Sequence, residues 1–121
     1  MEDSRIADNQ ITASSEYNSY HASNARLNSP SPAWFPTTDD LTPWIQVDLG
    51  VAKKVSGVVL QGRQDGDQWV THYKVQYGNG SSTLLMSATP MISQYQDKLV
   101  SHTLHSQQFC DFVMGNWVGK W

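Results

Sequence analysis

The four histidines are the residues best suited to acid–base or metal chemistry, and they are His21, His72, His102 and His105. The sequence holds no Gly-x-Ser-x-Gly elbow, phosphate-binding loop or paired-cysteine metal motif that would work with them. His102 and His105 are three positions apart, so on one strand they would point to opposite faces and could not bind one metal ion. We therefore expect structural or surface roles for the histidines, and a protein that is not an enzyme.

Two groups of aspartates are candidate calcium ligands, Asp39-Asp40 and Asp65-Gly66-Asp67. Calcium sites in proteins use about six to eight oxygen ligands, and each group brings only two carboxylates. The sequence therefore predicts no cofactor, and a structural calcium ion stays an open alternative.

Aromatic residues stand in a polar segment near the N-terminus, where Tyr17, Tyr20 and His21 lie between Ser15 and Ser23 without apolar periodicity. The segment is predicted to be a loop. Exposed rings with a polar tip are candidate contact groups for a ligand. Rings that fold back over the end of the core are the alternative, and the sequence leaves both open.

The strands expected to hold such loops in place include two that are predicted within residues 44–60. Apolar and polar residues alternate over 44–49, which predicts a half-buried strand. Gly50 ends it, two lysines mark a solvated turn, and the β-branched run 55–60 predicts a second, more deeply buried strand. We expect the two strands to form the central hairpin of a β-sandwich.

Further strands are predicted on both sides of this stretch. Residues 9–15 alternate weakly, whereas 69–77 alternate clearly and precede an Asn79-Gly80 pair that suits a hairpin turn. The weaker candidate strands are 84–86, 99–104 and 109–114.

A long connection, residues 28–43, precedes the central stretch. Three prolines within its residues 30–36 exclude both helix and central strand there. Trp34 is its expected apolar anchor. Loops of this length in a compact domain are often functional.

Composition limits the class of protein. The chain has 121 residues, which fits one domain over residues 1–121. Its net charge is −3, so nucleic acid, which needs clustered Lys and Arg, is not an expected partner. No apolar run reaches the ~18 residues of a membrane span, and residues 1–5 lack the features of a signal peptide. The single cysteine, Cys110, is expected to be a small buried side chain, and its redox state stays open.

Several segments resemble, in order and spacing, the discoidin domain, also called the C-type domain of coagulation factors V and VIII. They are ITASS at 11–15, ARLN at 25–28, AW at 33–34, WIQVDLG at 44–50, QGR at 61–63 and DQWVTHYKVQY at 67–77. The resemblance implies an all-β fold, an eight-stranded jelly-roll β-sandwich with ligand-binding loops at one end. Members of this family bind anionic phospholipids, galactose-type sugars, collagen or other receptors, and they serve cell adhesion, mostly outside cells.

The chain departs from that family in two ways. It lacks the cysteine pair that closes the domain in most extracellular members, and it lacks the final strand that usually follows the residue matched by Trp117. We therefore expect a jelly roll without its closing strand. Its open edge would invite pairing with another chain, so an oligomer or a fragment of a longer protein would fit this pattern.

The resemblance places three loops at the binding end, residues 15–26, 28–43 and 62–68. Their charged residues are Glu16, Arg26, Asp39, Asp40, Arg63, Asp65 and Asp67, which make the rim acidic. An acidic rim disfavours an anionic membrane. Tyrosine and histidine also suit a sugar or a protein surface better than acyl chains.

Arg63 matches an arginine that discoidin domain receptors use on collagen, and Asn28 stands where those receptors carry an acidic residue. Arg63 could supply a forked donor, with Asp65 and Asp67 as acceptors. A solvated turn with internal ion pairs is the open alternative. The predicted ligand-binding residues are Tyr17, Tyr20, His21, Asn28, Arg63, Asp65 and Asp67.

These observations predict a non-catalytic, lectin-like recognition module for cell adhesion, outside the cell or at its surface, with a cell-surface glycan or glycoprotein as partner. Two alternatives stay open. One is binding to anionic phospholipid, phosphatidylserine above all, and the other is an accessory carbohydrate-binding domain of a larger enzyme.

Overall fold

Five strands and two short 3-10 helices make up the part of the chain that the structure describes. The computed structural model describes residues 5–30, 33–63, 68–78, 85–92 and 100–120. In chain order the elements are η1 (Asp8–Gln10), β1 (Ile11–Ala13), η2 (Ala22–Asn24), β2 (Trp44–Leu60), β3 (Trp69–Gly78), β4 (Leu85–Ile92) and β5 (Val100–Lys120). The all-β prediction is confirmed. Neither of the helices in these ranges has the length or the apolar character that crossing a membrane requires.

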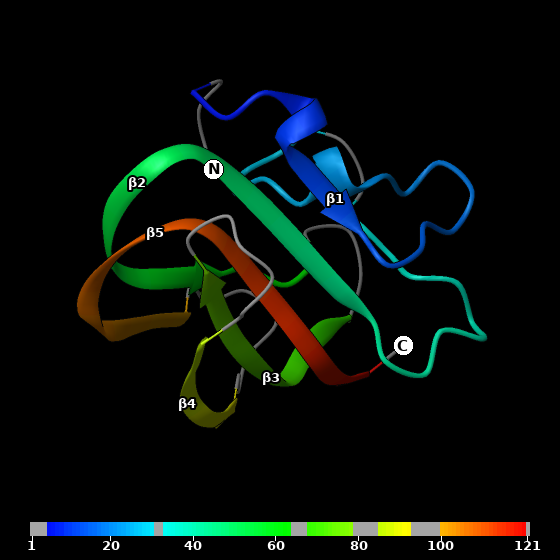
Figure 1. Ribbon diagram of the computed structural model, residues 1–121. Coiled ribbons are helices and arrows are strands. Elements are labelled where there is room, and N and C mark those ends of the chain that lie inside the picture. The colour runs from blue at the N-terminus through cyan, green and yellow to red at the C-terminus, as the bar shows by residue number, and fades with distance from the viewer. Residues whose placement is uncertain (1–4, 31–32, 64–67, 79–84, 93–99, 121) are drawn as a thin grey trace.

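The five strands form one antiparallel sheet in the order β1-β2-β5-β3-β4. β2 and β5 are its longest strands, and they pair along both of their halves, with Val47 opposite Phe112 and Val58 opposite His102. Figure 1 shows these two strands running side by side and bending over together at one end of the molecule. The sheet is therefore strongly curved about the β2–β5 pair.

The predicted central hairpin of residues 44–49 and 55–60 is wrong, because both segments belong to the single strand β2. The strand does not reverse; its register with β5 shifts between Asp48 and Lys53 instead. Gly50 lies in this interval with a φ of 74°, and its amide donates a hydrogen bond to the Asp48 carboxylate at 2.7 Å. A glycine in the left-handed region beside a bulge bends a strand without turning it back.

Replacing Gly50 by alanine is expected to lower the free energy of unfolding by about 1 kcal/mol. A Cβ at this position would lie 3.6 Å from Gln10 Nε2, an ordinary contact, so the cost comes from the positive φ. Urea titration measures the loss. Gly50→Asn should lose less stability, because asparagine tolerates the left-handed region. A urea midpoint that Gly50→Ala leaves unchanged would contradict the idea that the bend requires a glycine.

The core lies between β2, β3 and the segments that precede β2. Ile45 from β2 and Tyr73 and Val75 from β3 are each 1% exposed. Val47 is buried with them, and Val58 packs against the same cluster from the far half of β2. The segments before β2 add Ile6, Ile11, Ala22 and Trp34. The predicted burial of alternate residues is confirmed for Ile45 and Val47 in β2 and for Tyr73 and Val75 in β3. The run 55–60 was predicted to be buried more deeply and is not, because only one of its faces packs against the core and Val59 is 40% exposed. Burial raises the pKa of Tyr73 to about 12.

The C-terminal part differs from the two separate strands predicted at 99–104 and 109–114. Val100–Lys120 is one strand, which pairs with β2 on one side and with β3 on the other. The strand predicted at 69–77 is confirmed as β3, and it pairs with β4. The Asn79-Gly80 turn predicted to follow it lies outside the described residues.

Candidate functional site

A tight turn at residues 17–20 presents two tyrosines. Tyr17 and Tyr20 pair as an antiparallel bridge, with the Tyr20 amide donating to the Tyr17 carbonyl at 3.0 Å. Asn18 has a φ of 50°, a conformation that asparagine tolerates and that short reversals use. The tyrosine rings are stacked with centroids 6.4 Å apart. Tyr17 is 44% exposed and Tyr20 is half-buried, so the turn offers an aromatic face to solvent.

The loop 28–43 packs against this turn through Phe35. The Phe35 carbonyl accepts a hydrogen bond from the Tyr17 amide at 2.9 Å, and the Phe35 amide donates to the Tyr20 carbonyl at 3.4 Å. The rings of Phe35 and Tyr20 meet edge to face at 4.8 Å, one of the preferred arrangements of aromatic pairs. Trp34 is buried beside them, which confirms it as the anchor of the loop.

Arg63 joins these rings from the third predicted loop. Its guanidinium carbon lies 5.6 Å from the Phe35 ring centroid and 5.9 Å from that of Tyr20, within the range of cation–π attraction. Its Nη1 donates to the Gln68 side-chain oxygen at 2.7 Å, and its amide donates to the Gln68 carbonyl at 2.9 Å. We call Tyr17, Tyr20, Phe35 and Arg63 the aromatic–arginine cluster, which brings all three predicted binding loops together.

Asn28 is tied to the segment that leads to Arg63. It has a φ of 54°, its amide donates to the Gln61 side-chain oxygen at 2.8 Å, and its own side-chain oxygen accepts from Gln61 at 3.3 Å. Gln61 stands two positions before Arg63, so these bonds join Asn28 to the segment that carries Arg63. Asp65 and Asp67, the predicted acceptors, lie outside the described residues.

His21, the remaining predicted contact residue, pairs with Glu16. Its Nδ1 lies 2.8 Å from one Glu16 carboxylate oxygen, and the other oxygen accepts the Ala22 amide at 2.7 Å. The bond from Ala22 and then that from His21 hold the pKa of Glu16 below its usual 4.5, against a smaller desolvation effect. The Glu16 carboxylate therefore bonds groups of its own loop.

Asp40 is a second carboxylate of the predicted acidic rim that bonds within the protein. It accepts hydrogen bonds from the hydroxyls of Ser14 at 2.5 Å and Ser15 at 2.6 Å, and from the Thr42 amide at 3.2 Å. Burial acts to raise the pKa of Asp40, but these three hydrogen bonds outweigh it and the pKa lies below its usual 3.8. Asp40 thus ties the loop 28–43 to the segment after β1, while Asp39 is exposed.

Stability should fall as the pH drops through the lowered pKa of Asp40. A carboxyl whose pKa is lower in the folded chain contributes stability that is complete above its unfolded pKa, and this is lost as the pH falls through the folded pKa. Asp40→Asn keeps an acceptor oxygen but does not titrate. Urea titrations between about pH 2 and 6 should therefore give a flatter profile below about pH 4 for Asp40→Asn than for the parent chain. If the two proteins lose stability in parallel as the pH falls, Asp40 is not the group that causes the acid-dependent loss of stability.

Sequence reasoning missed Phe35, because it assigned the anchoring role of this loop to Trp34 alone. Phe35 contacts Tyr17, Tyr20 and Arg63, which come from other loops. The one signal that could have pointed to it is its type, an aromatic residue beside a buried tryptophan in a loop rich in proline.

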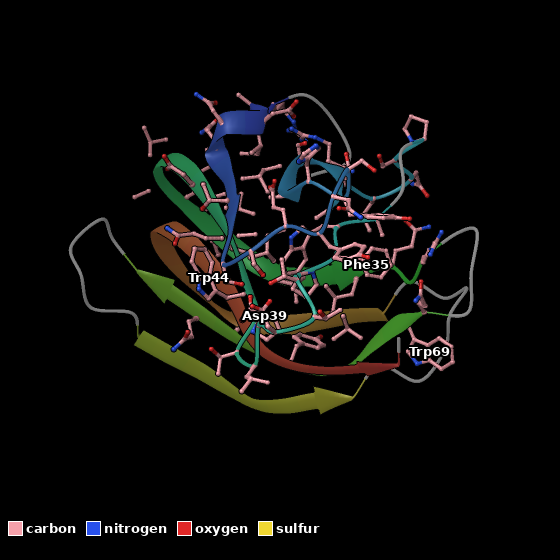
Figure 2. The ribbon with its side chains drawn as sticks, turned by 90° about the vertical axis from the view of Figure 1, so that its right-hand side faces the viewer. Phe35, Asp39, Trp44 and Trp69 are labelled. Carbon is pink, nitrogen blue, oxygen red and sulfur yellow. The ribbon has the colours of Figure 1, made fainter. Side chains whose placement is uncertain are left out.

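Two of the predicted binding loops project from the same side of the molecule. In Figure 1 the turn at 17–20 and the loop 36–43 both extend to the right of the sheet. Figure 2 faces that side, and on it Phe35 lies apart from Asp39 and Trp44. Within the described ranges, no group of three or more His, Cys, Asp or Glu side chains is arranged to hold a metal ion.

An antiparallel β fold with a cluster of aromatic and arginine side chains on the loops at one end is typical of a binding module. The F5/8 type C domain family matches residues 10–114 of this chain. Retinoschisin from Mus musculus is 42% identical over 85 residues, which are 64% of this chain and 38% of that protein. The chain therefore spans well under half of that relative.

Solved structures agree on the fold. Discoidin II from Dictyostelium discoideum superposes with a TM-score of 0.80 at 19% identity, over 91% of this chain and 49% of that one. The family 32 CBM from C. perfringens NanJ, solved in complex with galactose, gives a TM-score of 0.73 at 22% identity, over 91% of this chain and 84% of that one. The fold is thus the predicted jelly-roll β-sandwich. The chain belongs to the F5/8 type C domain family, the discoidin family that its sequence resembles.

Proposed function

We propose that the chain is a non-catalytic recognition module for cell adhesion that binds a glycan or glycoprotein at the aromatic–arginine cluster. One arrangement carries the proposal: the exposed Tyr17 ring is stacked with Tyr20, and Arg63 lies over Tyr20 and Phe35. The ligand would be met outside the cell or at its surface, where most members of the family act.

This arrangement suits the chemistry of a sugar. The C–H groups on one face of a sugar ring pack on an aromatic ring, and the tyrosine hydroxyl can bond a sugar hydroxyl at the same time. The arginine guanidinium offers donors in a fixed planar fork. Because Gln68 and the two rings already hold the Arg63 side chain, little rotamer entropy would be lost when it bonds a ligand.

A glycan is favoured over an anionic membrane by charge and by analogy. An anionic membrane surface favours a protein by about 1 kcal/mol for each nearby Lys or Arg, whereas this chain carries a net charge of −3. One structure with the same fold holds galactose, so galactose is the first probe for this chain. The cluster contains one cation, Arg63, which suits a sugar hydroxyl or a single acidic group better than a lipid surface.

The test compares two ligands on the whole 121-residue chain. Galactose and galactose-ended glycans are screened on an array and titrated, and phosphatidylserine vesicles are sedimented with the chain in the absence of calcium. We expect glycan binding that Tyr20→Ala weakens. Vesicle binding that neither Tyr20→Ala nor Arg63→Ala changes, without any glycan binding, would overturn the proposal.

One observation favours phospholipid as a second candidate ligand. Leu41, in the loop 28–43, is 90% exposed, and an apolar side chain on a projecting loop can enter a lipid surface. If phosphatidylserine is the ligand, Leu41→Ser should reduce vesicle binding about tenfold or more, since burying a leucine is worth about 1.5–3 kcal/mol. If the glycan is the ligand, Leu41→Ser should leave the galactose titration unchanged.

A further inference from the structure

We propose that Glu16 is a positioning residue, whose carboxylate closes the Tyr17–Tyr20 turn from the face opposite the aromatic rings and so holds those rings in their ligand-binding arrangement. This rests on the function proposed above for the aromatic–arginine cluster. Its structural part, the dependence of the turn on Glu16, can be measured without any ligand.

The carboxylate joins the two ends of the turn. Glu16 precedes Tyr17, and its two oxygens bond the two residues that follow Tyr20: one lies 2.8 Å from His21 Nδ1, and the other accepts the Ala22 amide at 2.7 Å. The Ala22 amide begins the 3-10 helix η2, where no earlier carbonyl in the helix can pair with it. One side chain therefore closes the base of the turn and also caps the helix that follows.

The register of the turn separates this carboxylate from the aromatic face. Tyr17 and Tyr20 are partners in an isolated antiparallel bridge, and Glu16 and His21 are the residues that flank it, with extended backbone at His21. Successive residues of an extended segment point to opposite faces. The tyrosine rings thus occupy one face of the turn while Glu16 and His21 meet on the other, and a ligand on the rings would not compete with Glu16.

The bond to the Ala22 backbone is the stronger half of this arrangement. Glu16 and His21 side chains are 39% and 57% exposed, and an exposed ion pair contributes little by itself. The Ala22 bond is charge-assisted and is the largest contribution to the lowered pKa of Glu16. A glutamine at position 16 would keep an acceptor for the Ala22 amide, whereas an alanine would not.

The test compares Glu16→Ala and Glu16→Gln with Asp8→Ala, in the whole 121-residue chain. Asp8 is the matched control, because it is an exposed carboxylate with a charged hydrogen bond to Arg26 at 2.6 Å, made by η1 outside the turn. Ring-to-ring nuclear Overhauser effects between Tyr17 and Tyr20 report the turn in the free protein. Galactose titration reports affinity, and urea titration reports global stability.

We expect Glu16→Ala to lose the Tyr17–Tyr20 ring contacts and to weaken galactose binding about three- to tenfold, with a urea midpoint close to that of Asp8→Ala. Glu16→Gln should restore both the ring contacts and most of the affinity. Unchanged ring contacts in Glu16→Ala would overturn the inference. If the parent chain does not bind galactose, the proposed sugar ligand fails, but the ring contacts still decide whether Glu16 positions the turn.

Discussion

Alanine in place of Tyr20 is expected to weaken glycan binding at least about tenfold, which is about 1.4 kcal/mol. Tyr20 is the residue that the rest of the aromatic–arginine cluster shares. Its ring stacks with Tyr17, meets Phe35 at 4.8 Å and lies 5.9 Å from the Arg63 guanidinium carbon. The substitution therefore removes a stacking surface and also frees the arginine from one of its two rings. Calorimetric titration with galactose, or with the strongest glycan from the array, measures the change.

Two conservative variants separate the contributions of ring and charge. Tyr17→Phe keeps the stacked ring and loses one hydroxyl, so we expect its affinity for the glycan to fall by less than about fivefold. Arg63→Lys keeps the charge but loses the planar fork that bonds Gln68 and stacks on two rings, so its loss should approach that of Tyr20→Ala. Full affinity in a folded Tyr20→Ala protein would place the ligand away from the cluster.

Alternation along one segment was enough to predict β3, because half of that strand faces the core. Tyr73 and Val75, two positions apart, are both 1% exposed. The bend in β2 could not be predicted in this way. A glycine followed by lysines is compatible with a hairpin turn and also with a bulge. Which of the two forms depends on whether another long strand pairs with the residues on both sides of the glycine. That strand is β5, which lies far along the chain.

In the candidate site, too, some residues could be predicted from the sequence, whereas others depend on contacts between distant segments. Residue type and loop position singled out Tyr17 and Tyr20, and the resemblance to the discoidin family singled out Arg63. The structure brings all three into one cluster. The roles of Phe35 and Asp40 follow from contacts between loops. Asp40, for example, bonds Ser14 across 26 positions of sequence, so its carboxylate could be counted as part of an acidic rim from the sequence but not recognised as a tie between loops.

Among single substitutions in the site region, Trp34→Ala is expected to cost the most stability, about 3–5 kcal/mol. The Trp34 side chain is 6% exposed and packs in the same cluster as Ile45 and Val47. Its Nε1 also donates to the Ser15 carbonyl at 2.9 Å. Alanine would leave a cavity and an unpaired carbonyl. The total free energy of unfolding of a small domain is about 5–15 kcal/mol. Urea unfolding followed by circular dichroism should therefore show a large shift in the midpoint.

Trp34→Phe is the matched variant, because it fills most of the cavity and removes the indole N–H. We expect it to cost about 1–2 kcal/mol, and it keeps the test open if Trp34→Ala does not fold. Trp34 is next to Phe35, whose backbone bonds both Tyr17 and Tyr20, so losing the anchor should weaken galactose binding as well as stability. A Trp34→Ala protein of unchanged stability would mean that the Asp40 hydrogen bonds hold the loop 28–43 without the indole.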